Sequence, residues 1–223
     1  MNIIFDLDGT LVDSAQLCAE ILTEMLAERG FDRVLATTDA RSYLTKGGTQ
    51  LVTAFLGSDG DKIESDLAEF RARYAARRTP ADCLYPGVAE GLSALSQLGL
   101  KMAICSNKPQ ALCEKIIADL ELGRHCPIVV GSADGVPLKP AAALALMALE
   151  RLGAAPVDCF YVGDSEVDSR TAANAGIAFL FATWGYAETG GNIEALARFN
   201  RFHDVVRYVT EHPGRASDQR RAG

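Results

Sequence analysis

Residues 3–10 read Ile3-Ile4-Phe5-Asp6-Leu7-Asp8-Gly9-Thr10. An apolar run followed at once by a polar cluster predicts a buried strand that ends in a loop. Residues two apart in an extended segment lie on one side, so Asp6 and Asp8 can face one site. Two crowded carboxylates repel each other unless a cation or proton lies between them, and Mg²⁺ is a hard cation that takes oxygen ligands. The alternative is a polar turn with helix-capping carboxylates.

The chain after this loop divides into a helical part and a part in which strands and helices alternate. Residues 15–83 carry apolar residues at helical spacing without strand signals, and Ser14 is a candidate cap for a first helix over 14–29. After Tyr85-Pro86-Gly87, the pattern predicts strands at 101–105, 127–130, 159–162 and 177–181, separated by helices at 88–98, 110–120, 141–152 and 167–175. This alternation favours the α/β class, with a Rossmann-like doubly wound parallel sheet and a small helical domain inserted after the first strand.

The same pattern predicts the domain boundaries. We expect residues 1–14 and 85–211 to form the α/β core domain and residues 15–84 to form the inserted helical cap domain. Residues 212–223 contain Pro213, Gly214 and several arginines, which is typical of a flexible C-terminal tail.

Three further polar clusters are expected where ligands bind in doubly wound sheets, outside the carboxyl ends of the strands. They are Ser106-Asn107-Lys108 after the second core strand, Lys139 before an alanine-rich helix, and Asp164 with Asp168 after a later strand. Each has a structural alternative, because Ser106-Asn107 can cap a helix, a lone lysine is usually solvated, and acidic residues complement a helix N-terminus. Taken together, they place candidate metal and phosphate ligands at one edge of one sheet.

Four motifs occur along the chain in this order: FDLDGTLVDS, CSNK, LKP and VGDSEVD. With these motifs the chain resembles the haloacid dehalogenase superfamily, specifically its capped phosphatases, and most closely the phosphoglycolate phosphatase group. The resemblance covers about residues 2–185. It implies that Asp6 is the nucleophile and Asp8 the general acid and base. Dehalogenases of this family lack the second carboxylate, so Asp8 favours phosphoryl transfer.

The resemblance also implies the remaining site. Phosphate would be bound by Ser106, Asn107 and Lys139, together with Gly9 and Thr10, which would shape the first loop. Mg²⁺ would be held by Asp6, Asp164 and the main-chain carbonyl of Asp8, and Asp168 would support it without direct coordination. In the cap, Lys46-Gly47-Gly48 is the candidate substrate-sensing loop, although a plain polar turn between helices is the alternative.

The resulting hypothesis is a Mg²⁺-dependent phosphatase that hydrolyses a small, phosphoglycolate-like phosphate monoester through an aspartyl-phosphate. One alternative is a sugar phosphomutase of the β-phosphoglucomutase type. An alternative of a different class is a non-catalytic binding protein on the same fold, which the filled catalytic positions disfavour.

Composition sets the expected partners and compartment. The net charge of −7 argues mildly against nucleic acid, so the expected partner is a small phosphorylated metabolite. The six cysteines form no CxxC pair, which favours reduced, buried thiols. No signal peptide and no apolar stretch of membrane-spanning length are evident, so we expect a cytoplasmic protein that does not bind membranes. It is expected to be a monomer or homodimer.

Overall fold

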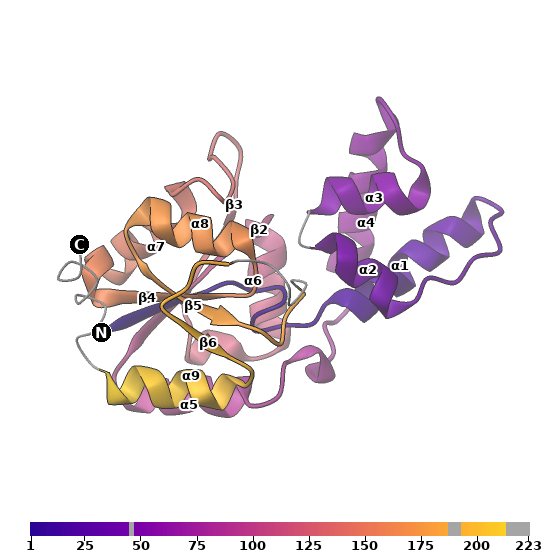
Figure 1. Ribbon diagram of the computed structural model, residues 1–223. Coiled ribbons are helices and arrows are strands. Elements are labelled where there is room, and N and C mark those ends of the chain that lie inside the picture. The colour runs from indigo at the N-terminus through magenta and orange to yellow at the C-terminus, as the bar shows by residue number, and fades with distance from the viewer. Residues whose placement is uncertain (45–46, 187–192, 213–223) are drawn as a thin grey trace.

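The computed structural model describes residues 1–44, 47–186 and 193–212 (Figure 1). Within these residues, six parallel strands form one sheet in the order β3-β2-β1-β4-β5-β6. The strands are β1 Asn2–Phe5, β2 Lys101–Pro109, β3 Ile128–Ser132, β4 Cys159–Gly163, β5 Ala178–Ala182 and β6 Ala197–Phe199. The order reverses at β1, so this strand lies in the middle of the sheet and its carboxyl end is at the switch point. The predicted α/β fold class is confirmed.

Both faces of the sheet are covered by helices, as its apolar strands require. Side chains of β1 alternate between the two cores, with Ile3 and Phe5 in one and Ile4 in the other. Figure 1 shows α7 and α8 on one face and α5 and α9 on the other. The core helices are α5 Val88–Gln97, α6 Gln110–Asp119, α7 Ala143–Leu152, α8 Glu166–Ala175 and α9 Phe202–Glu211. The described part of the chain also contains three short 3₁₀ helices, η1 Ala81–Cys83, η2 Leu122–Arg124 and η3 Pro156–Asp158.

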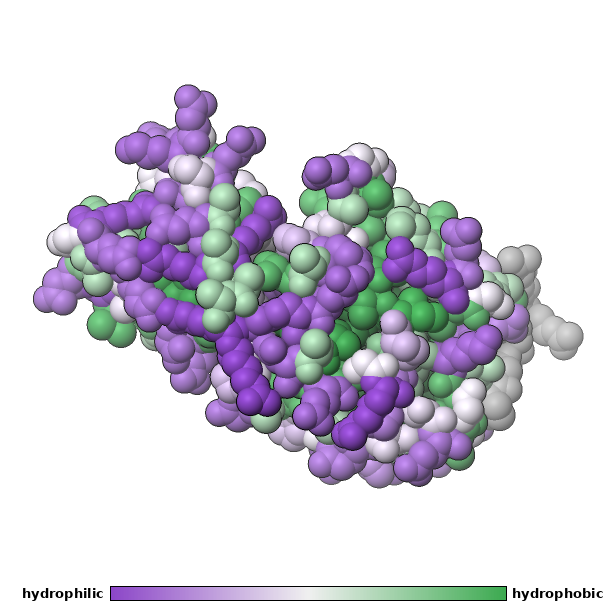
Figure 2. Space-filling model, turned by 180° about the vertical axis from the view of Figure 1, so that it is seen from behind, coloured by the Kyte–Doolittle hydropathy of each residue, from purple (hydrophilic) through white to green (hydrophobic). Residues whose placement is uncertain are grey.

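In the described residues between β1 and α5, four helices lie beside the sheet (Figure 1), and we call them the cap helices. They are α1 Ala15–Glu28, α2 Thr37–Leu44, α3 Gly48–Leu56 and α4 Lys62–Ala76. Their apolar faces pack on one another, and residues such as Leu22, Val52 and Phe70 are buried there. Figure 2 shows this smaller lobe and the core lobe from behind, with a notch between them and mainly hydrophilic residues on the smaller lobe. The division at residues 14 and 84 stays a prediction.

Several expected local features differ in the structure. Ser14 precedes α1 but makes no side-chain capping bond, because its hydroxyl donates to Asp8 Oδ1 at 2.6 Å. Strand β2 continues past Cys105, since Pro109 pairs with Ser132 beyond an irregularity in register. The elements β6 and α9 were not predicted. Of the predicted tail at 212–223, residues 213–223 lie outside the described residues.

Two expectations from composition can be compared with the structure. The cysteines are all free and buried, which confirms the interpretation as buried thiols: Cys18, Cys83, Cys105, Cys113, Cys126 and Cys159. No helix in the described part of the chain combines the length and apolar character needed to cross a membrane.

Candidate active site

The carboxyl edge of the sheet and the cap helices enclose a cavity of about 580 Å³. Parallel strands bring their carboxyl ends to one edge, and the loops after β1, β2 and β4 therefore meet here. The predicted site residues that line the cavity are Asp6, Asp8, Ser106, Asn107, Lys139, Asp164, Gly47 and Gly48. Lys46 lies outside the described residues. The structure thus brings together motifs that are more than 150 residues apart in the chain.

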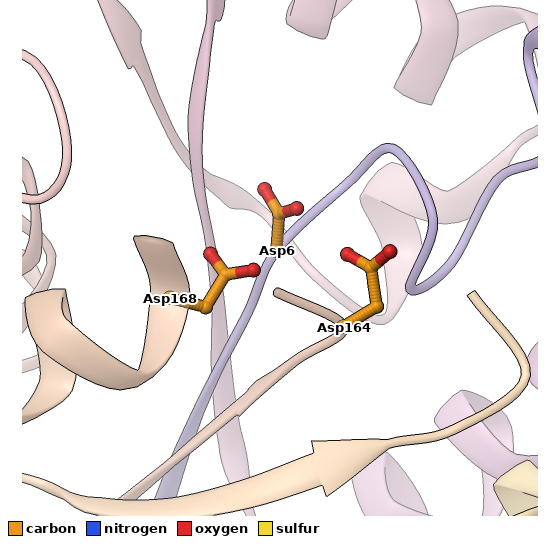
Figure 3. Close-up of side chains that lie close together, drawn as sticks. All are labelled: Asp6, Asp164 and Asp168. Carbon is orange, nitrogen blue, oxygen red and sulfur yellow. The ribbon is translucent and has the colours of Figure 1, made fainter. Parts of the chain in front are cut away.

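Three buried carboxylates gather at the base of this cavity. Asp6 follows β1, Asp164 follows β4 and Asp168 lies on α8, and their carboxylates point toward one another (Figure 3). Each offers an oxygen, and these oxygens all lie within 4.8 Å of one another. Burial, and next the charge of Asp168, raise the pKa of Asp6 to about 7 despite the lowering effect of Lys139. Burial and the neighbouring carboxylates also raise the pKa of Asp164 well above its usual value.

Lys139 is the buried cation of this cluster. Its Nζ lies 2.8 Å from Asp6 Oδ1 and 2.6 Å from Asp168 Oδ1, and it also donates to the carbonyl of Cys105 at 3.2 Å. The Lys139 side chain is only 4% exposed. The charge of one lysine can neutralise only one of the three carboxylates. The carboxylate oxygens of this cluster therefore fit a hard divalent cation that takes oxygen ligands.

Asn107 fixes the position of the Lys139 loop. Its Nδ2 donates to the carbonyl of Lys139 at 3.0 Å, and its Oδ1 accepts from the Lys139 backbone N–H at 2.7 Å. The amide of Asn107 is therefore engaged with Lys139, while its predicted contact with phosphate stays a prediction. The Ser106 hydroxyl accepts from the Lys108 backbone N–H at 3.2 Å, which leaves its own proton available to a ligand in the cavity.

Gly9 and Thr10 form the turn beneath Asp164. Gly9 has φ +85°, and an added Cβ would overlap the Asp164 carboxylate, so only glycine fits this turn. Thr10 is buried, its hydroxyl has no hydrogen-bond partner among the described residues, and its carbonyl accepts from Trp184 Nε1 at 3.1 Å. These two residues therefore form the turn next to Asp164, while their predicted contact with phosphate stays a prediction.

Asp8 is held by two side chains that sequence reasoning did not connect with it. The Ser14 hydroxyl donates to Oδ1 at 2.6 Å, and Lys108 Nζ lies 3.0 Å from Oδ2. Lys108 Nζ also lies 4.4 Å from the centre of the Tyr74 ring on α4. Its position in the Ser106-Asn107-Lys108 motif was the available signal, but its partners depend on how the cap helices pack.

Tyr186 is a second residue that the sequence analysis missed. Its backbone N–H donates to Asp164 Oδ2 at 2.6 Å, and its hydroxyl accepts from the Ser14 N–H at 2.8 Å. The hydroxyl also lies 3.2 Å from Asp13 Oδ1, to which it can donate. Tyr186 therefore joins the acidic cluster to the segment where the chain enters the cap helices.

The chain resembles known proteins in sequence. A sequence model described as haloacid dehalogenase-like hydrolase matches residues 3–182. A phosphoglycolate phosphatase of Rhodobacter capsulatus is 34% identical over 207 residues, covering 91% of this chain and 92% of that protein. One of Aquifex aeolicus (strain VF5) is 32% identical over 211 residues, covering 94% and 97%.

Two solved structures share the fold. A protein of Haemophilus somnus 129pt, titled a predicted phosphoglycolate phosphatase, has a TM-score of 0.80 at 23% identity and covers 93% of this chain and 97% of its own. CbbY of Rhodobacter sphaeroides in complex with phosphate has a TM-score of 0.74 at 21% identity and covers 92% and 95%.

Proposed function

The chain belongs to the haloacid dehalogenase-like hydrolases and is a phosphatase of that family, and we propose that it hydrolyses a small phosphate monoester of the phosphoglycolate type through an aspartyl-phosphate on Asp6. The observation that carries the mechanism is the buried cluster of Asp6, Lys139, Asp164 and Asp168 at the switch point of the sheet. The substrate class is supported by relatives of 32–34% identity named phosphoglycolate phosphatase.

The reaction follows from the positions of two carboxylates. A carboxylate oxygen of Asp6 attacks phosphorus, and the bond from phosphorus to the ester oxygen breaks as Asp8 delivers a proton to that oxygen. Asp8 then removes a proton from water, which attacks the phosphoryl group, breaks its bond to Asp6 and releases inorganic phosphate. The contact of Lys139 with Asp6 Oδ1 orients the nucleophile, and its charge balances the phosphoryl oxygens. Ser106 donates a hydrogen bond to phosphate.

We propose Mg²⁺ as the divalent cation. Asp6, Asp164 and the main-chain carbonyl of Asp8 would hold it, while Asp168 acts through Lys139 and through Ser165, whose hydroxyl lies 2.5 Å from Asp168 Oδ2. When bound, it would supply positive charge to the phosphoryl oxygens.

Mg²⁺ should raise the melting temperature more at about pH 8 than at about pH 5. Asp6 has a pKa of about 7 in the folded, metal-free protein against 3.8 ordinarily, so metal-free stability falls as pH rises from about 4 through about 7. A cation needs ionised carboxylates and so competes with protons at low pH. At about 100 times its dissociation constant, Mg²⁺ adds about 2.7 kcal/mol, or about 5–10 °C for this size of chain.

Thermal unfolding with and without Mg²⁺ measures this shift. Asp164→Asn is the matched variant, since it removes one charged ligand while keeping the acceptor for the Tyr186 N–H. It should lose most of the Mg²⁺-dependent shift. An equal shift in both proteins would show that the cation binds elsewhere.

Phosphate release from a panel of phosphomonoesters, with and without Mg²⁺, tests the proposed function. The panel contains 2-phosphoglycolate, sugar monophosphates, a nucleoside monophosphate and pyrophosphate. We expect Mg²⁺-dependent release, fastest with a small ester such as 2-phosphoglycolate. If a sugar monophosphate were isomerised without phosphate release, the phosphomutase alternative would hold instead.

A further inference from the structure

Lys108 is a cation at the cap-facing wall of the cavity whose role the reaction above does not use. It lies at the end of β2, its side chain is 12% exposed, and its ammonium is placed between Asp8 Oδ2 at 3.0 Å and the face of the Tyr74 ring at 4.4 Å. An ammonium over an aromatic face in a partly desolvated site is stabilised by the ring quadrupole. A ring from the cap and a carboxylate from the core therefore hold this charge inside the cavity.

The surroundings of Lys108 offer few other groups that recognise a charged ligand. Much of the cavity wall is apolar, with Leu44, Leu51, Leu67, Phe70 and Leu112 among its residues. Among the described residues, the other cations that line the cavity are Lys139 and Arg71. Lys139 is engaged with Asp6 and Asp168, and Arg71 is exposed on α4. Lys108 is thus the described cation best placed for an anionic group beyond the phosphate.

The contact with Asp8 sets how far that anionic group can be from the reacting bond. Asp8 gives its proton to the leaving oxygen, so a cation 3.0 Å from Asp8 lies beside the leaving group. A carboxylate bonded directly to the ester carbon is within reach of such a cation. A second phosphate on the far side of a sugar ring would lie further from Asp8.

We propose that Lys108 determines substrate specificity by binding a carboxylate on the leaving group, with Tyr74 holding the ammonium against the cap. The inference rests on the proposed phosphatase function and deepens it, because it selects 2-hydroxy-acid phosphates over neutral esters of the same size. On substrate binding, the carboxylate of the substrate replaces Asp8 Oδ2 as the ion-pair partner of Lys108, and no covalent bond is made or broken.

The test compares kcat/KM for 2-phosphoglycolate with kcat/KM for ethyl phosphate, which has the same carbon chain without the carboxylate. Lys108→Met should lower the ratio of the two values about 10- to 100-fold, as expected when a charge-assisted contact is lost. Any effect of the substitution on Asp8 acts on both substrates and cancels in the ratio. Lys108→Gln, which keeps a polar side chain, should show the same direction and serves if Lys108→Met does not fold.

Arg71→Met is the matched control, because it removes the other available cation from the same cavity and should leave the ratio within about threefold of wild type. An unchanged ratio in active Lys108→Met and Lys108→Gln, or a drop caused by Arg71→Met, would overturn the role of Lys108. Failure of the wild type to hydrolyse either ester would instead contradict the proposed function. Binding then tests the role of Lys108 separately, since wild type should bind glycolate more tightly than glycolamide and Lys108→Met should lose that preference.

Discussion

Asp6→Asn should lower the rate of phosphate release by at least about 10⁴-fold, a loss of the size seen when a covalent nucleophile is removed. Asparagine has the shape of aspartate and keeps an oxygen that can accept from Lys139 Nζ, which lies 2.8 Å from Asp6 Oδ1. The amide cannot act as the carboxylate nucleophile, so positioning is kept while the proposed covalent step is lost. Initial rates with saturating substrate and Mg²⁺ measure the effect.

The fold of this variant should survive, which separates chemistry from stability. In the metal-free protein the pKa of Asp6 is raised to about 7, mainly by burial, so its ionised form is costly there and a neutral amide removes that cost. The metal-free melting temperature at about pH 8 should therefore be no lower than that of wild type. Asp158→Asn, the same change at the exposed last residue of η3, is the control and should retain full activity. More than about one-tenth of the wild-type rate in Asp6→Asn would rule out Asp6 as the nucleophile.

The sequence predicted those site residues that come directly after a strand. Asp6, Ser106 and Asp164 each follow an apolar run, and parallel strands bring their carboxyl ends to one edge whatever the details of packing. The same logic predicted the α/β fold and the helical insertion, because hydrophobic periodicity is a local signal. Even α9 had such a signal in the spacing of Phe202, Val205 and Val209, all of which are buried.

Contacts that depend on two distant segments were not predictable in this way. The Tyr186 hydroxyl accepts a hydrogen bond from the N–H of Ser14, which is 172 positions away in the chain. The Tyr74 ring contacts Lys108 only because the fold brings α4 close to the end of β2. Ser14 illustrates the ambiguity of local rules, since a serine before a helix is typical of a cap. Here its hydroxyl donates to Asp8 instead, because the loop after β1 turns that carboxylate toward it.

Lys139→Met should abolish phosphatase activity and also destabilise the protein by about 3–5 kcal/mol, the cost of leaving a buried charge without its partner. Lys139 Nζ lies between Asp6 and Asp168, whose side chains are only 10% and 1% exposed, so water cannot replace it. Thermal and urea unfolding of the metal-free protein measure the loss, which corresponds to about 6–20 °C in melting temperature. Lys101→Met, the same change at the exposed start of β2, should cost no more than about 0.5 kcal/mol.

A second substitution separates the structural role of Lys139 from its catalytic role. In the Lys139→Met background, Asp168→Asn removes the carboxylate that faces the missing ammonium and should recover much of the lost stability, because the two residues are directly coupled. Activity should not return, since neither substitution restores a positive charge beside Asp6 Oδ1 and the transferred phosphoryl group. If the double variant regained activity together with stability, Lys139 would act only as a counter-charge that permits folding. If neither recovered, the coupling through Asp168 would be wrong, and Asp6 would be the partner that makes Lys139 indispensable.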